Sequence, residues 1–350
     1  MDATRRTLLR NAGVAAAGTM IFQPAAEGAP RQAGTTSAAS PGTSVPALRS
    51  LAYCMLRSPQ GEGLGVRREN RILDVAKAGK ALRVTVPAST DELIEGKAVA
   101  GLQKVLAAPA SAVRTALLPI EEARFAPCIT RPQKIIMLGF NYRKHALETN
   151  TPFPKAPVLF NKYNNALLGH EGTIKLPTKV AKKFDYEVEL QVIMGRIARD
   201  VSEGEALGHV FGYATGNDFS ARDLQLRDGR GASQFMIGKT SDGFMPIGPW
   251  LVGADLVGDP QKLKVETRVN GETRQSSNTD DMIFDCKKII SYTSQHWTLK
   301  PGDIFFTGTP GGVINGYPPE KQVWLKAGDK ITSTIEKLGE LRFSLTQQQA

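Results

Sequence analysis

The feature that most constrains the fold is a run of short apolar segments that begins near Pro132 and continues almost to the carboxyl end. Turns rich in glycine separate these segments, which include QKIIMLGF, YEVELQVIMG and HVFGYATGND. The pattern is typical of strands, and it shows no regular alternation with helices. No GxGxxG or GxxxxGKS/T motif opens a helix, so a Rossmann or P-loop fold has no support. We therefore predict an α+β, mostly β domain over residues 130–346.

Two local signals place elements within this domain. Asn270 and Gly271 lie between alternating apolar runs, which is a strong signal for a β-hairpin. Asp285 can cap a helix through CKKIISYTSQHW, in which Ile289 and Ile290 lie on one face.

Residues 49–126 are predicted to form a small amino-terminal α+β domain. SLAYCMLR and GLGVRR alternate like short strands on either side of the turn-like SPQGEG. Residues 91–106 carry apolar side chains at helical spacing, which predicts a helix there. Nothing in this region suggests catalysis.

The first 28 residues resemble a twin-arginine export signal, because Arg5 and Arg6 precede a short apolar stretch and small residues. The stretch is too short for a transmembrane helix. Residues 29–48 are rich in Ala, Pro, Gly, Ser and Thr, which predicts a disordered linker. We therefore expect a periplasmic protein with no stable membrane span once the signal is cleaved. The alternatives are a non-functional leader, which leaves the protein in the cytoplasm, and an uncleaved segment that acts as an anchor.

The composition argues against some classes of protein. The formal net charge is +10, but the basic residues are scattered and no basic motif with interleaved aromatic residues occurs. Nucleic-acid binding is therefore not expected, whereas a basic surface can steer small anionic substrates. The three cysteines, Cys54, Cys128 and Cys286, are far apart and odd in number, so they form neither a disulfide framework nor a CxxC zinc site.

Two carboxylates interrupt an apolar strand in FDYEVEL, residues 184–190. Residues i and i+2 of a strand face the same side, so Glu187 and Glu189 project together. Two such groups repel each other, and a divalent cation removes the conflict by binding both. Asp218, at the end of HVFGYATGND, is available as a third oxygen ligand of the kind that Mg²⁺, Mn²⁺ or Ca²⁺ prefers. The alternative for Glu-x-Glu is an exposed strand face.

A candidate general base lies in NYRKHALE, residues 141–148, directly after a predicted strand. His145 and Glu148 are three residues apart and therefore neighbours on one helical turn. A carboxylate beside an imidazole orients the ring and raises its basicity. The alternative is a surface histidine or one satisfied in the core.

Two loops carry further candidates. Lys239 lies in GKTSDGFMPIGPW, a loop in which backbone and side chain can approach a ligand, although a solvated lysine is the alternative. FTGTPGG, residues 306–312, is a strand followed by a glycine-rich turn whose N–H groups can bind a carboxylate.

Together these motifs resemble the fumarylacetoacetate hydrolase family over roughly residues 135–345. The matching pieces, in the family's order, are NYRKHALE, YEVEL, GYATGNDFSARDLQ, GKTSDGFMPIGP and GDIFFTGTPGGV. The resemblance implies a mixed β-roll or β-sandwich catalytic domain, a small amino-terminal α+β domain and a homodimer.

The resemblance also assigns roles to residues. It implies Mg²⁺ or Mn²⁺ held by Glu187, Glu189 and Asp218, and His145 with Glu148 as the base that activates water. It implies that Lys239 polarises the scissile carbonyl. The substrate contacts that it implies are Tyr142, Arg222, Gln225 and Thr309.

The leading functional hypothesis is a metal-dependent hydrolase that cleaves a C–C bond in a 2,4-dioxo acid, such as an acylpyruvate or fumarylacetoacetate, in the catabolism of aromatic compounds. The metal would act as Lewis acid and template, while His145 activates water and Lys239 stabilises the oxyanion. The same-fold alternatives are an isomerase of the 5-carboxymethyl-2-hydroxymuconate type, an oxaloacetate decarboxylase type and a ureidoglycolate-type lyase. An alternative of another class is a non-catalytic exported binding protein, against which the presence of His145 and Glu148 counts.

Overall fold

The computed structural model describes residues 46–226 and 234–348. The described residues form one compact unit. The predicted signal over residues 1–28 and most of the predicted linker lie outside the described residues. The described residues begin with the 3-10 helix η1 (Pro46–Ser50), in which Leu48 is buried.

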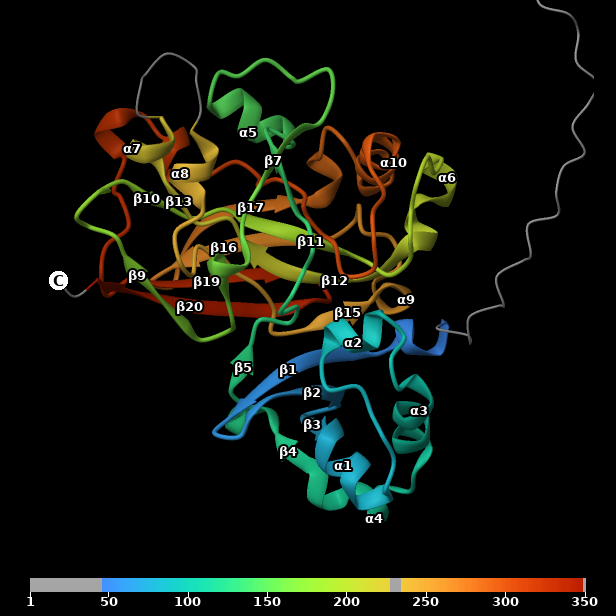
Figure 1. Cartoon of the computed structure of the whole chain (residues 1–350). Coiled ribbons are helices and arrows are strands. Elements are labelled where there is room, and N and C mark those ends of the chain that lie inside the picture. The colour runs from blue at the N-terminus through green and yellow to red at the C-terminus, as the bar shows by residue number, and fades with distance from the viewer. Residues whose placement is uncertain (1–45, 227–233, 349–350) are drawn as a thin grey trace, which may run out of the picture. The chain divides into compact units, whose positions relative to one another are not determined.

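The largest sheet has eleven strands and runs through the middle of the unit (Figure 1). Ten strands follow the order β4-β3-β2-β1-β15-β12-β11-β18-β6-β7, and β5 pairs with β1. All neighbours are antiparallel except β18 and β6. The strands are β1 (Ala52–Ser58), β2 (Gly61–Arg68), β3 (Arg71–Asp74), β4 (Leu117–Pro119), β5 (Phe125–Ala126), β6 (Ile135–Gly139), β7 (Val158–Asn161), β11 (Val188–Met194), β12 (Val210–Asn217), β15 (Leu251–Gly253) and β18 (Ile304–Phe306).

A second sheet of five strands packs against the first, since β11 and β12 contact β16, β19 and β20. Its order is β17-β16-β19-β20-β9, and two small sheets pair β10 with β13 and β14 with β8. These strands are β8 (Leu167–Leu168), β9 (Gly172–Leu176), β10 (Phe184–Asp185), β13 (Ser220–Ala221), β14 (Met245–Pro246), β16 (Lys264–Val269), β17 (Glu272–Asn278), β19 (Lys330–Ile335) and β20 (Gly339–Gln347). The predicted mostly-β, α+β class is confirmed.

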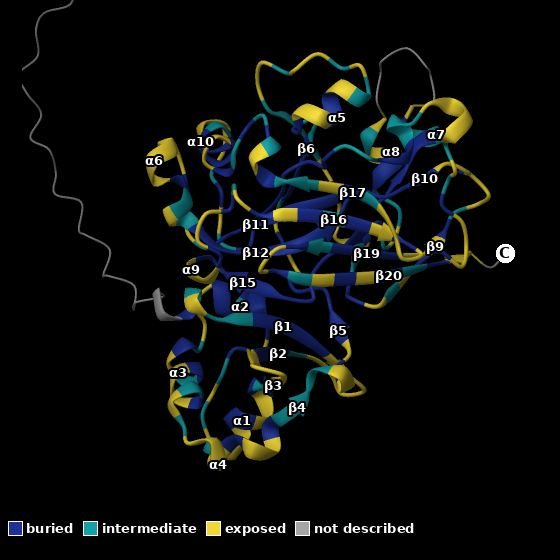
Figure 2. Cartoon of the chain, turned by 180° about the vertical axis from the view of Figure 1, so that it is seen from behind, coloured by how far each residue is buried: buried dark blue, intermediate teal, exposed yellow. Residues whose placement is uncertain are grey.

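The helices are short and lie around the sheets (Figures 1 and 2). Helices α1 to α4 cover the strands β1 to β4, whereas α5, α7 and α8 gather at one end of the central strands (Figure 1). Among the described residues, no helix combines the length and apolar character needed to cross a membrane. The α-helices are α1 (Val75–Leu82), α2 (Thr90–Ile94), α3 (Val99–Ala107), α4 (Ala110–Val113), α5 (Arg143–Glu148), α6 (Glu203–Ala206), α7 (Arg222–Gln225), α8 (Phe235–Lys239), α9 (Ala254–Val257) and α10 (Cys286–His296).

Two of the local predictions are confirmed. Asn270 and Gly271 both have positive φ, 52° and 88°, and join β16 to β17 as the tight hairpin that such a pair favours. Asp285 caps α10 by accepting a hydrogen bond from the Lys288 N–H at 2.8 Å.

The single helix predicted over residues 91–106 is wrong. The chain forms α2 and α3 instead, because Gly96 and Ala98 adopt φ values of 82° and 50°. Left-handed residues cannot continue a right-handed helix, and the apolar spacing does not reveal this break. The division into domains 49–126 and 130–346 stays a prediction, and the large sheet draws strands from both sides of it.

The complete burial of β11 yields a stability prediction. Leu190 is fully buried in the core, so Leu190→Ala is expected to lower the free energy of unfolding by about 2–5 kcal/mol. Leu256→Ala on α9 is the matched control, since 48% of Leu256 is exposed, and its change should stay within about 0.5 kcal/mol. Urea denaturation measures both, and equal losses would contradict the packing described for β11.

Candidate active site

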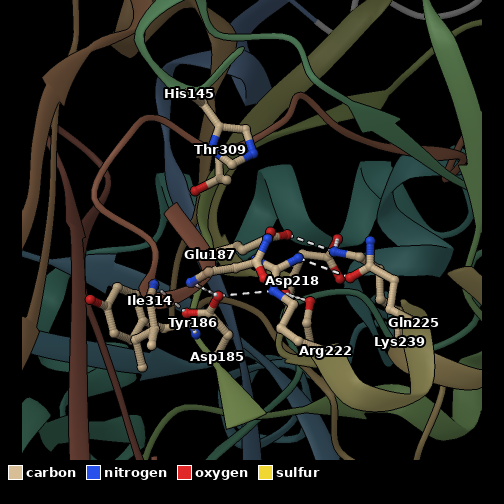
Figure 3. Close-up of polar contacts among 12 residues, drawn as sticks. His145, Asp185, Tyr186, Glu187, Asp218, Arg222, Gln225, Lys239, Thr309 and Ile314 are labelled. Carbon is tan, nitrogen blue, oxygen red and sulfur yellow. Dashed lines mark hydrogen bonds and ion pairs between the residues drawn. The ribbon is translucent and has the colours of Figure 1, made fainter. Parts of the chain in front are cut away.

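Three carboxylates meet where β11 and β12 pair. Glu187 precedes β11, Glu189 belongs to it, and Asp218 follows β12. One oxygen from each lies within 4.8 Å of the others, and all three side chains are buried. Figure 3 shows Glu187 and Asp218 turned toward each other. The exposed-face alternative for Glu-x-Glu is therefore excluded.

The local sequence explains this placement. Val188 and Leu190 pack into the core on the other face of β11, so alternation turns the two glutamates toward the site. Gly216 lies directly opposite Glu189 on β12. A Cβ at this glycine would lie 2.2 Å from Gln191 Nε2, so the close packing beside Glu189 requires a residue without a side chain.

Buried cations compensate most of this negative charge. Lys239 Nζ donates to Glu187 Oε2 and to Asp218 Oδ2, both at 2.7 Å. The Arg222 guanidinium donates to Glu187 Oε1. Lys162 Nζ lies 2.6 Å from Asp218 Oδ1. No lysine or arginine in the described part of the chain forms an ion pair with Glu189.

The pKa values follow these pairings. Burial favours the neutral form of both glutamates, but Arg222 and Lys239 outweigh it and hold the pKa of Glu187 below its usual value. Burial, and then the charges of Asp218 and Glu187, raise the pKa of Glu189 well above its usual value. Burial lowers the pKa of Lys239, but Asp218 and Glu187 reverse the shift and raise it. Glu189 is thus the carboxylate that most needs a further positive charge.

Lys162 is a residue of the site that the sequence analysis missed. It follows β7 and is buried, with its ammonium hydrogen-bonded to the carbonyls of Phe219 and Phe244. Burial lowers the pKa of Lys162, and Asp218 opposes this shift. The signal in the sequence is a lysine directly after an apolar strand, but its partner lies more than fifty residues away.

The predicted base is assembled on α5. His145 Nδ1 lies 2.8 Å from Glu148 Oε1, and Glu148 Oε2 accepts a hydrogen bond from the Gly312 N–H at 2.7 Å. Phe140 stacks on the imidazole with a centroid separation of 6.4 Å. With Glu148 accepting at both oxygens, we assign the ring proton to Nδ1, which leaves Nε2 free to accept a proton.

A small cavity of about 30 Å³ joins the base to the carboxylates. It is lined by His145, the triad, Arg222, Gln225, Lys239 and Thr309, together with apolar side chains. Most residues predicted for the site therefore lie together. A larger cavity of about 650 Å³ is lined by residues that include Lys134, Tyr163 and Trp297, but by no carboxylate. Chemistry rather than size therefore identifies the site.

Tyr142 is the predicted substrate contact that does not line the cavity. It is fully buried in the core, and its backbone bridges to Met282. Burial, and then the charge of Glu189, raise the pKa of the Tyr142 hydroxyl well above its usual value. The role of Tyr142 as a substrate contact stays a prediction. Thr309 lines the cavity, and its hydroxyl accepts a hydrogen bond from Gln275 at 2.8 Å.

The donor set fits a hard divalent cation. Three carboxylates supply oxygen ligands only, which suits Mg²⁺ or Mn²⁺ better than zinc. Glu189 has no cationic partner among the residues that the structure describes, and its raised pKa marks the surplus of negative charge that such an ion would neutralise. Mg²⁺ in particular, rather than Mn²⁺, stays a prediction.

Comparison with known proteins decides the family. Residues 134–346 match the model of the fumarylacetoacetate (FAA) hydrolase C-terminal domain. The chain belongs to this family. An FAA hydrolase structure from psychrophilic Exiguobacterium antarcticum is 32% identical with a TM-score of 0.70, covering 85% of this chain and all of that one. The predicted family fold is thereby confirmed.

Other relatives in the FAA hydrolase family carry names of activities. "Oxaloacetate tautomerase FAHD2A, mitochondrial" of Bos taurus is 41% identical over 83% of this chain and 90% of its own length. "Oxaloacetate tautomerase YisK" of Bacillus subtilis is 40% identical over 78% of this chain and 92% of its own. A fumarylpyruvate hydrolase structure from Pseudomonas aeruginosa, in complex with Mn²⁺ and pyruvate, is 31% identical with a TM-score of 0.55, covering 64% of this chain and 92% of that one.

These comparisons correct one prediction and leave two open. The predicted periplasmic location is wrong, because relatives from Bos taurus and Homo sapiens are named as mitochondrial proteins. An arginine-rich start before apolar residues is not specific to export, since other targeting segments share it. The predicted twin-arginine signal and homodimer have no support from these comparisons.

The raised pKa of Glu189 yields a pH-dependent prediction. Without metal, the stability contributed by its proton is complete below pH 4.5 and is lost as the pH rises through the folded-state pKa, since the unfolded chain releases that proton first. The neutral amide of Glu189→Gln has no such proton to lose, so the stability of this variant does not depend on that titration. In EDTA, the melting temperature of the variant minus that of the wild type should therefore grow between pH 4 and pH 8, which differential scanning fluorimetry measures.

The same variant tests the metal site. Mn²⁺ at one hundred times its Kd should stabilise the wild type by about 2.7 kcal/mol, and Glu189→Gln should lose most of this gain. Asp303→Asn is the control, because Asp303 is equally buried but pairs with Lys134, outside the site. A full Mn²⁺ response in Glu189→Gln would remove Glu189 from the ligand set.

Proposed function

We propose that this protein is a divalent-metal-dependent tautomerase of a small 2-oxo dicarboxylic acid of the oxaloacetate type. The observation that carries the proposal is the similarity, over nearly their whole length, to two relatives named oxaloacetate tautomerase. The site supports it, because a base, an ammonium group and an acidic triad line one cavity. This replaces C–C hydrolysis, the leading sequence hypothesis, with the isomerase class that was its alternative.

The acidic triad would bind the cation through Glu187, Glu189 and Asp218. The bound ion would act as a Lewis acid toward the 2-oxo group and as a template for the neighbouring carboxylate. Lys239 places its ammonium between Glu187 and Asp218, and the positive charge favours oxygen that becomes anionic during the reaction.

His145 would move the proton. Conversion of enol to keto form removes a proton from the enol hydroxyl and adds one to the adjacent carbon. Nε2 of a neutral His145 can accept the first proton, and the imidazolium can return a proton to carbon, so the ring ends as it began. Glu148 stabilises the imidazolium between the two transfers through the 2.8 Å contact with Nδ1.

The tautomerase assay decides between the proposed reactions. We expect the protein with Mg²⁺ or Mn²⁺ to accelerate loss of the enol absorbance of oxaloacetate, and EDTA to abolish the effect. The same reactions are analysed for pyruvate, which would indicate decarboxylation, and run with an acylpyruvate, whose cleavage would indicate hydrolysis. Cleavage without tautomerase activity would overturn the proposal and favour the hydrolase, the second candidate, which the similarity to fumarylpyruvate hydrolase supports.

Substitution of the base tests the proposed proton transfer. His145→Asn keeps a polar side chain of similar reach but removes the basic Nε2, so kcat for tautomerisation should fall about 10²–10⁴-fold. His296→Asn is the matched control, because His296 ends α10 and does not line the site cavity, and it should keep the wild-type rate. Stopped-flow absorbance measures both, and an unchanged kcat in His145→Asn would remove this role.

A further inference from the structure

A fourth buried carboxylate lies beside the triad without belonging to it. Asp185, in β10, is fully buried, and both of its oxygens accept hydrogen bonds. Arg222 Nε donates to Oδ2 at 2.9 Å, and the backbone N–H groups of Ile314 and Asn315 donate to Oδ1 and Oδ2 at 2.9 and 3.1 Å. Asp185 therefore joins Arg222 to the turn formed by residues 312–316 (Figure 3).

One set of hydrogen bonds connects Asp185 to the triad through Arg222. The Arg222 guanidinium donates to Asp185 from Nε and to Glu187 from a terminal nitrogen, while its other terminal nitrogen bonds Gln225 at 2.9 Å. A guanidinium is planar, so fixing one edge fixes the direction of the others. The orientation of Glu187 thus depends on the anchor that Asp185 gives to Arg222.

A second set of hydrogen bonds connects Asp185 to the base through the turn at residues 312–316. Tyr186 donates its hydroxyl proton to the Gly312 carbonyl at 3.0 Å, and the Gly312 N–H in turn donates to Glu148 Oε2. Glu148 orients His145. The turn fits closely around this carboxylate, since a Cβ at Gly316 would lie 2.6 Å from Glu148 Cδ. A shift of the turn would therefore move Glu148.

We infer that Asp185 is a positioning residue that sets the acidic triad and the His145–Glu148 base relative to each other. The inference rests on the proposed function for the catalytic meaning of this geometry. Its test by Mn²⁺ affinity and hydrogen exchange does not depend on that function. Asp185 touches neither the cavity nor the reacting groups, because its hydrogen bonds go to Arg222, to Tyr186 and to the turn. It acts through Glu187 on one side and through Glu148 on the other.

The principal test is Asp185→Asn. The amide keeps the shape of the carboxylate, but its NH₂ group must face either Arg222 or the turn. Both sides offer only hydrogen-bond donors, so the hydrogen bonds on one side are lost. We expect Mn²⁺ affinity, measured by titration calorimetry, to fall about 10–100-fold, as for other groups that orient metal ligands. Amide hydrogen exchange should rise both in the turn and in α5.

Asp303→Asn is the matched control for a merely structural role. Asp303 is also fully buried, pairs with Lys134 at 2.9 Å, and accepts backbone hydrogen bonds from Lys134 and Lys300. It should lower the melting temperature but leave Mn²⁺ affinity and exchange in α5 at wild-type values. If Asp185→Asn behaves like Asp303→Asn in these two measurements, the inference is wrong.

Tyr186→Phe tests the contacts from the turn to Glu148 by themselves, including the case in which Asp185→Asn does not fold. It removes the hydrogen bond to the Gly312 carbonyl and leaves Asp185 and Arg222 intact. Exchange should rise in the turn and in α5, while Mn²⁺ affinity stays within twofold of the wild type. Unchanged hydrogen exchange in the turn and in α5 would contradict the claim that the turn positions Glu148.

A double-mutant cycle on kcat adds a readout that general destabilisation does not change. If Asp185 acts through Glu148, Asp185→Asn combined with Glu148→Gln should reduce kcat by less than the product of the single effects. Fully multiplicative effects would contradict the coupling. Absence of tautomerase activity in the wild type would instead count against the proposed function, and the Mn²⁺ and exchange measurements would still decide the role of Asp185.

Discussion

The structure around the site depends on one electrostatic balance. Asp185, Glu187, Glu189 and Asp218 are all buried, Asp185 in β10 and the other three where β11 and β12 pair. Removing an unpaired carboxylate from water costs several kcal/mol even after the protein relaxes. The arrangement is tolerable because three buried cations, Lys162, Arg222 and Lys239, lie among the carboxylates.

The two sheets fix the geometry of this balance. The antiparallel register sets Glu189 opposite Gly216, and the core residues on the other face of β11 prevent the strand from slipping by one residue. The strand β18 pairs with β11, and the chain after it leads through Thr309 to the turn that holds Glu148. The acidic triad and the predicted base thus come from segments far apart in the sequence but attached to strands of one sheet.

The sequence predicted the parts of this site whose chemistry is visible locally. Glu187 and Glu189 are spaced for one strand face, and His145 and Glu148 for one helical turn, so short-range geometry is enough to pair them. Lys162 and Asp185 could not be found this way. Lys162 follows an ordinary apolar strand, and Asp185 looks like the polar start of another. Their partners, Asp218 and the turn at residues 312–316, come close only when the sheets assemble.

The fold, like the site, has features that the local sequence predicts and features that it does not. The hairpin at Asn270 and Gly271 and the cap at Asp285 rest on backbone conformations that the residue types themselves favour. The break between α2 and α3 rests on left-handed φ at Gly96 and at Ala98, and alanine gives no local warning of it. Apolar spacing reports which side chains are buried, and it continues unchanged across a break that keeps the same face inward.

The residues that line the cavity bear on the choice between tautomerase and hydrolase. His145, Lys239 and the carboxylate triad line it together, so a base and an ammonium group lie beside the candidate metal site. Hydrolysis requires a water molecule held beside His145 in addition to the substrate. Tautomerisation requires only the imidazole and the substrate itself. The base and the triad are therefore sufficient for proton transfer within one bound molecule, which is the reaction that we propose from the relatives named oxaloacetate tautomerase.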